Sequence, residues 1–136
     1  CDLQEDADAK SQYYYEWSLV AFAQKNFQKV RELANLAIKS NPNNGKAYIA
    51  IGNAYAADAK NIGQEQVEHS AVYWAAVDKF TKAKQVDPSC EAEANEKINT
   101  YKKYFPNKEE AFMFGIKEGE PYTVGGWINE KTTARY

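Results

Sequence analysis

Small and large residues alternate at helical spacing in the middle of this 136-residue chain. The positions that carry the pattern are Tyr48, Ile51, Gly52, Tyr55, Ala76, Phe80, Ala83 and Pro88. Residues three or four positions apart lie on one face of a helix, so the pattern predicts two helices that each pack along one face. Gly52 and Ala76 would let the two helix axes approach closely, and Tyr55 and Phe80 would fill the space beside them. The chain is therefore expected to fold into pairs of antiparallel helices.

An earlier and weaker copy of this pattern ends at Pro42. Counting back by the spacing of the later copy gives the corresponding positions Tyr14, Trp17, Ser18, Ala21, Val30, Ala34 and Ala37. Asn26 and Phe27 would form the turn between its two helices. The later copy has about 12 more residues between its helices than a regular repeat. Residues 59–70 are therefore expected to be an inserted loop or an extension of both helices.

The remainder of the chain departs from the repeat. A fifth helix is expected to begin at Ser89, and Asn107 is suited to cap a short sixth helix. Beyond Gly119, β-branched and aromatic residues predict a small hairpin or an extended arm packed on the last helix. The expected fold is all-α, an antiparallel helix-turn-helix superhelix of about five to six helices with a short extended or β-hairpin tail.

These segments set the expected domain boundaries. Residues 1–106 would form the helical repeats, with copies at about 11–44 and 45–90 and a partial third copy at 91–106. Residues 107–136 would add a C-terminal capping helix and an extended tail. The chain thus predicts one helical unit followed by a short terminal segment.

Charge and hydropathy argue against nucleic acid as a partner and against insertion into a membrane. The chain has 17 basic and 19 acidic residues and a net charge of -2, which gives no general attraction for nucleic acid. It lacks an apolar run near the roughly 18 residues of a membrane span, so no membrane insertion is expected. Cys1 stands at the first position, either because the chain is a piece of a longer protein or because this cysteine bears the lipid of a bacterial lipoprotein.

The residues that usually carry catalysis are sparse. His69 is the single histidine, so neither a histidine-rich metal site nor a Ser-His-Asp triad is supported, and a solvated loop position is expected for it. Glu65 and Glu68 could help to bind a metal, but carboxylates at this spacing are ordinary on helix ends. Cys90 is interpreted as a half-buried thiol. An enzyme that uses His69 with the two glutamates is the weakest of the hypotheses, and no cofactor is expected.

The repeat pattern resembles that of the tetratricopeptide repeat (TPR) family over residues 12–101. The resemblance rests on Gly52, Tyr55, Ala76, Phe80, Ala83 and Pro88. The whole chain, including residues 122–128, is also similar to the C-terminal region of TPR proteins from Bacteroidetes, whose members are often exported to the cell envelope. The resemblance implies a fragment of a longer helical array and an exported, periplasmic or envelope location.

The resemblance further implies a concave groove, lined by the first helices of successive repeats, that holds an extended peptide or a partner helix. Carried over by register, the groove-facing residues are Gln12, Tyr15, Leu19, Lys46, Ile49, Asn53, Asn95, Asn99 and Lys102. Lys46 and Asn53 are seven residues apart and share a helix face, so one carboxylate could meet both. Related repeats that clamp chaperone carboxylates use Lys and Asn in such helices, but Ala50 and Glu96 stand where further polar or basic groups would help.

Two functions follow from this pattern. The first is a non-catalytic scaffold that binds an unidentified protein or peptide in the groove. The alternative is a structural role, in which residues 105–136 cap the open end of a longer TPR array and have no binding role of their own. Both can hold in one protein.

Overall fold

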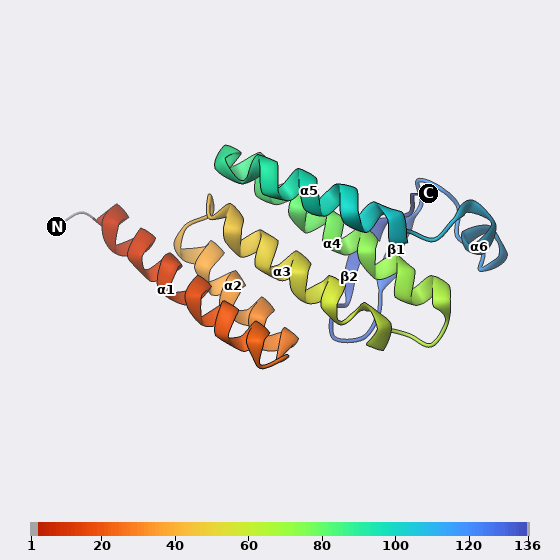
Figure 1. Ribbon diagram of the computed structural model, residues 1–136, viewed down its shortest axis with the longest axis horizontal. Coiled ribbons are helices and arrows are strands. Elements are labelled where there is room, and N and C mark those ends of the chain that lie inside the picture. Colours follow the sequence, from red (N-terminus) through yellow and green to blue (C-terminus); the bar gives the residue numbers. More distant parts are fainter. Residues whose placement is uncertain (1–2, 136) are drawn as a thin grey trace.

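The computed structural model of the chain describes residues 3–135 (Figure 1). The helices are α1 (Leu3–Ala23), α2 (Phe27–Ser40), α3 (Gly45–Ala57), α4 (Gln66–Val86), α5 (Glu91–Tyr101) and α6 (Lys108–Met113). Short 3-10 turns and strands complete the fold: η1 (Ala59–Asn61), η2 (Pro88–Cys90), η3 (Lys102–Tyr104), β1 (Pro121–Val124) and β2 (Glu130–Thr133). The predicted all-α class with a short β-hairpin tail is confirmed. Cys1 lies outside the described residues.

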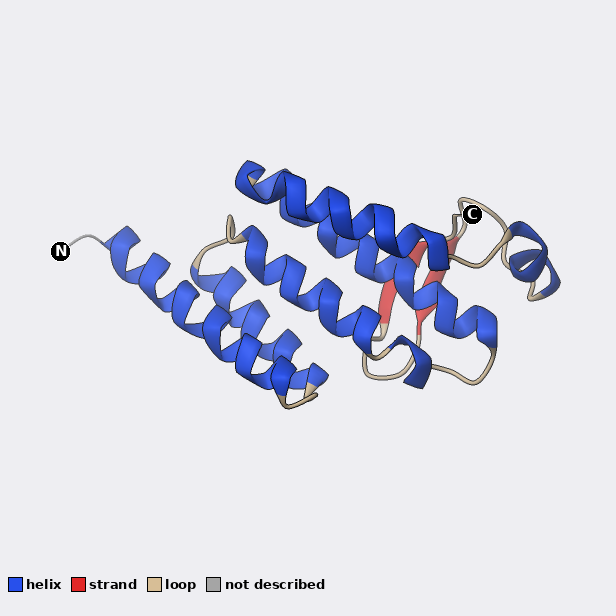
Figure 2. Ribbon diagram, viewed as in Figure 1, coloured by secondary structure: helices blue, strands red, loops and turns tan. Residues whose placement is uncertain are grey.

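The first five helices form a stack in which each helix packs against the next one along the chain. Helix α3 lies between α1 and α5, and these three helices are nearer the viewer than α2 and α4 (Figure 1). Helix α1 also contacts α3 directly. The two-stranded hairpin lies on the far side of α4 (Figure 2). The molecule therefore has a layer made of α1, α3 and α5, and an opposite side that carries the hairpin.

Local capping explains where several helices begin and end. The side chains of Asn44 and Asn107 accept hydrogen bonds from the amides of Ala47 and Glu110, which starts α3 and α6. Helix α1 ends at Ala23, and Lys25 two residues later has a φ of 60°, which lies in the left-handed region. The amide of Lys25 bonds back to Phe22, as in a common helix-terminating motif. The hydrogen bond that Asn107 accepts from Glu110 confirms the predicted cap at the start of α6.

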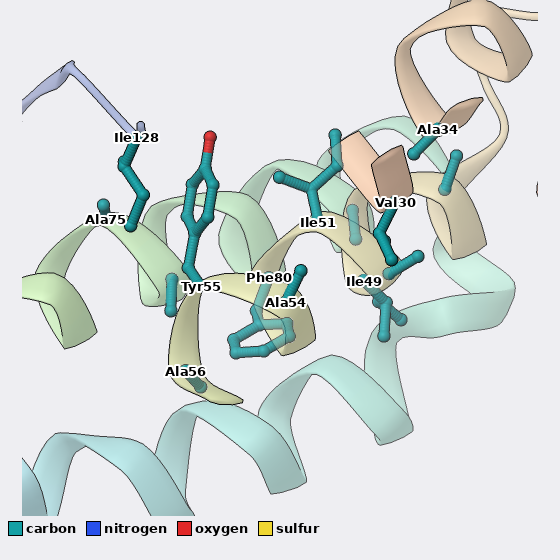
Figure 3. Packing of buried hydrophobic residues seen from close by; sticks show 14 of the residues in the cluster. Val30, Ala34, Ile49, Ile51, Ala54, Tyr55, Ala56, Ala75, Phe80 and Ile128 are labelled. Atoms are coloured by element: carbon teal, nitrogen blue, oxygen red, sulfur yellow. The ribbon is translucent and has the colours of Figure 1, made fainter. Parts of the chain in front are cut away.

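The core is built around the predicted close approach of α3 and α4. A Cβ atom added to Gly52 would lie 2.6 Å from a ring carbon of Phe80, so only glycine fits between the two helices. Phe80 is fully buried, and Tyr55 is 1% exposed. Figure 3 shows these rings together with Val30, so α2, α3 and α4 all contribute to one cluster.

The extra residues between α3 and α4 form both a loop and a helical extension. Residues 59–61 make the turn η1, and α4 then starts at Gln66 and runs for 21 residues, compared with 13 in α3. The side chains of Glu65 and Glu68 form a capping box at the start of α4. The insertion therefore lengthens α4 but not α3, and the two glutamates stabilise its first turn.

Of the two forms expected for the tail, the structure has the small hairpin. The hairpin packs against α4, and Ala134 just after β2 belongs to the same buried cluster as Ala111 of α6. The strands pair antiparallel, with Pro121 opposite Thr133 and Val124 opposite Glu130. The connection between them reaches α2, where the guanidinium of Arg31 donates to two backbone carbonyls at 2.6 Å. These long-range polar contacts, together with the buried side chains of Val124 and Ile128, hold the tail against the helices.

Candidate functional site

Helix α3 exposes a narrow stripe on an otherwise buried surface. Lys46 is exposed, Asn53 is half-buried and Ala57 is exposed, and their spacing of seven and four residues places them on one face. Nine of the thirteen residues of α3 are buried. Lys46 and Asn53, with the half-buried Tyr48, are therefore the polar residues that α3 presents toward solvent.

The amide of Asn53 has an unused acceptor. Its Oδ1 atom is buried and accepts no hydrogen bond from the residues that the structure describes. A buried acceptor without a donor costs about 1 to 3 kcal/mol. Because an amide side chain can accept and donate at once, it is suited to pair with the backbone of a bound peptide. The exposed Lys46 and the half-buried carboxamide of Asn53 make the stripe on α3 a candidate binding surface.

Tyr15 of α1 is half-buried and packs against the main core cluster. Burial raises the pKa of its hydroxyl, and the negative charge of Glu93 on α5 raises that pKa further.

The other residues of the predicted groove differ in their exposure and in their hydrogen bonds. Gln12 is exposed and bonds to Glu16 on its own helix, at 3.3 Å. Ile49 is 4% exposed and belongs to the core cluster, so it offers no side chain to a ligand. Asn95 accepts a hydrogen bond from Lys84 of α4 at 2.8 Å, which turns its carboxamide oxygen toward α4.

The remaining predicted positions, Leu19, Asn99 and Lys102, are exposed, and Leu19 is 47% exposed. Lys46 and Asn53, which share the exposed face of α3, therefore form the centre of the candidate site, and Tyr15 is a half-buried residue of α1 that packs against the core.

A pocket adjoins the C-terminal ends of α3 and α5, where α4 is extended. Its volume is about 400 Å³. It is lined by Ala59, Lys60, Gln66, His69, Ser70, Tyr73, Lys103, Tyr104, Phe105 and Glu110. The pocket contains two lysines and aromatic side chains, so it can accept a group that is partly apolar and partly anionic.

His69 has a different setting from the one that the sequence predicted. It lies on α4 and is half-buried, whereas a solvated loop was expected. Its Nδ1 atom is 2.9 Å from the carbonyl oxygen of Ile62. A carbonyl only accepts, so Nδ1 carries the proton and Nε2 is left as the acceptor when the ring is neutral. The insertion places this ring at the pocket because it extends α4.

A row of tyrosines runs from the core toward the same pocket. The rings of Tyr73 and Tyr101 stack with centroids 5.6 Å apart, and Tyr73 and Tyr104 are 5.3 Å apart. Tyr101 in turn stacks on Phe80. The three tyrosines come from α4, α5 and η3, which a single helical period does not connect, so sequence periodicity does not reveal this row.

The described residues contain little that resembles a catalytic centre. No group of three or more His, Cys, Asp or Glu side chains is arranged there to hold a metal ion. Burial raises the pKa of the Cys90 thiol, and a hydrogen bond and the charge of Asp87 raise it further, which keeps the thiol protonated. None of the described helices combines the length and the apolar character that a membrane span requires.

Comparisons with known proteins give no further assignment. A scan against protein-family models, a search of curated proteins and a search of solved structures each found no significant match to this chain.

Proposed function

We propose that this chain is a TPR-type helical repeat module that binds an extended peptide or partner segment along the face formed by α1, α3 and α5, and that it is not an enzyme. The observation that carries the proposal is the stripe on α3, where Lys46 is exposed and Asn53 is half-buried on a helix of which nine of the thirteen residues are buried. The carboxamide of Asn53 can pair with the backbone of a bound segment, and Lys46 can meet an acidic group.

The spacing of the polar groups suggests what such a segment contains. Lys46 and Asn53 are separated by seven residues of helix, about 10 Å along its axis. An extended peptide covers about 10 Å in three residues. The favoured ligand therefore has an acidic group about three residues from the point where its backbone pairs with Asn53. A large apolar side chain of the same segment would suit the row formed by Tyr73, Tyr101 and Tyr104.

The proposal is tested with a random-peptide display library selected on the immobilised chain. Selected peptides are then measured against a triple variant, Tyr15→Ala with Lys46→Ala and Asn53→Ala. We expect peptide affinity to fall at least about tenfold, because the backbone pairing and the charge contact are both lost. Peptides that bind the folded triple variant as tightly as the native chain would refute the groove.

A matched control uses the same residue types outside the groove. The triple variant Tyr13→Ala, Lys29→Ala and Asn35→Ala changes exposed residues of α1 and α2. It should bind the selected peptides like the native chain. A comparable loss in both triple variants would attribute the effect to general destabilisation.

A structural cap is the second candidate, and the polar contacts of the tail favour it. Arg31 donates to the backbone of Trp127 and Ile128, and the indole of Trp127 donates to Asp58 at 2.7 Å. If residues 105–136 act as a cap, grafting them onto an unrelated repeat array should yield a stable monomer. An array that gains no stability from the graft would argue against the cap.

A further inference from the structure

The end of α6 and the residue that follows it present three consecutive large apolar side chains to solvent. Phe112, Met113 and Phe114 are 74%, 87% and 46% exposed. These three residues are called the α6 knob below. Ala111 and Ile116 on either side are buried, so the knob is anchored to the rest of the chain. An apolar patch of this kind is a characteristic of interaction sites.

Acidic residues adjoin the knob. Glu109 and Glu110 immediately precede its anchor, and both are exposed. The surface that a partner would meet therefore combines large apolar side chains with two carboxylates. Such a surface fits an apolar pocket with basic residues at its edge.

A pocket of that composition has a volume of about 600 Å³ and lies between the end of α1, the start of α2, the end of α3 and η1. It shares Lys60 with the pocket that Glu110 lines. It is called the α1–α3 pocket below. Phe22, Ala23, Phe27 and Ala57 form its apolar part, and the two phenylalanine rings meet edge to face with centroids 5.4 Å apart.

Two lysines complete the α1–α3 pocket. Lys25 and Lys60 line it together with Asn61, and both lysines are exposed. The apolar part and the two positive charges of the pocket thus match the apolar part and the two negative charges of the knob. In Figure 1, α6 and the turn between α1 and α2 lie well apart, so a knob does not reach the pocket of its own chain.

We propose that the α6 knob of one copy of this chain inserts into the α1–α3 pocket of a second copy. The two surfaces are different, so the contact is heterologous and each copy offers one knob and one pocket. Association then proceeds head to tail. It uses neither Asn53 nor Lys46, and Ala57 is the residue of the α3 stripe that also lines the α1–α3 pocket.

Charge reversal on each side tests the pairing. The pocket variant carries Lys25→Glu and Lys60→Glu, and the knob variant carries Glu109→Lys and Glu110→Lys. Each variant alone opposes like charges, so the weight-average mass in sedimentation should stay that of a monomer where the native mass rises with concentration. Mixing the two variants in equal amounts opposes unlike charges at both kinds of contact, so the mass should rise again.

Two further variants test the apolar contact and the specificity of the charge effect. Phe112→Ser with Met113→Ser removes the apolar contact and should lower the association constant at least about tenfold. Lys39→Glu with Lys131→Glu reverses two exposed lysines elsewhere and should associate like the native chain. The proposal is overturned if the native chain remains monomeric at all concentrations, if the serine variant associates normally, or if the mixture of charge variants stays monomeric.

Discussion

Replacing Arg31 by methionine measures how strongly the tail is held to the helical stack. Arg31 donates at 2.6 Å to the carbonyl oxygens of Trp127 and Ile128, and its guanidinium lies 5.0 Å from the centroid of the Trp127 ring. Methionine preserves most of the apolar stem but has no donor. Both carbonyl oxygens would lose a charged donor, and the cation–π contact would be lost with them.

The expected cost follows from these contacts. A hydrogen bond to a charged group contributes about 1.5 to 3 kcal/mol, so two of them set an upper range of about 3 to 6 kcal/mol. Arg31 is only partly buried, and water can therefore replace some of what it supplies. We expect Arg31→Met to lower the free energy of unfolding by about 2 to 3 kcal/mol.

Urea denaturation followed by tryptophan fluorescence gives this value from the shift of the midpoint at constant slope. Lys29→Met is the control, because Lys29 lies on the same helix and forms an exposed ion pair with Glu32 at 3.7 Å. It should change stability by less than about 1 kcal/mol. A loss from Arg31→Met that is no larger than that of the control would show that the tail does not depend on this contact.

Three further changes test the packing. Gly52→Leu should cost about 1 to 3 kcal/mol in chemical denaturation, because even a Cβ atom would lie 2.6 Å from Phe80, and a neutral result would exclude the close approach. Lys25→Gly should stabilise the chain by about 0.5 to 1 kcal/mol in the same assay, because glycine adopts the left-handed φ of 60° without steric cost. Burial raises the pKa of the Tyr55 hydroxyl, so the stability that Tyr55 contributes is complete below about pH 10 and is lost as the pH rises further. In urea titrations at a series of pH values, the free energy of unfolding of Tyr55→Phe should therefore depend less on pH above about 10.

The helices were predictable because their signals are local. Gly52 and Phe80 carry the repeat spacing, and Asn107 caps α6 through a hydrogen bond to a residue three positions along the chain. Such features depend on neighbours within one or two helical turns. The sequence therefore predicts the elements and the close approach of α3 and α4.

The docking of the tail and the details of the candidate site were not predictable in this way. Arg31 and Ile128 are separated by 97 positions in the sequence, and no periodicity relates them. Asn95 was assigned to the groove by register, but Lys84 of α4 engages its oxygen. A helical period fixes which residues share a face, whereas the neighbour that covers that face depends on the tertiary packing. The position of His69 at a pocket likewise depends on the tertiary packing, because the insertion extends only α4.

The contacts that hold the tail and the candidate groove lie on opposite sides of α3, and this arrangement relates the two proposed functions. Asn53 and Tyr55 are both on α3, but Tyr55 is nine residues from Lys46, which places it about 180° around the helix from the polar stripe. The hydroxyl of Tyr55 donates to Glu130 of β2 at 2.7 Å, and Glu130 also pairs with Lys79 of α4 at 2.6 Å. The tail thus contacts α3 and α4 on the side opposite the polar stripe and leaves the stripe of α3 uncovered. A segment that holds the helices in register in this way would also keep the groove in one shape, so a capping role for the tail and a binding role for the groove support each other.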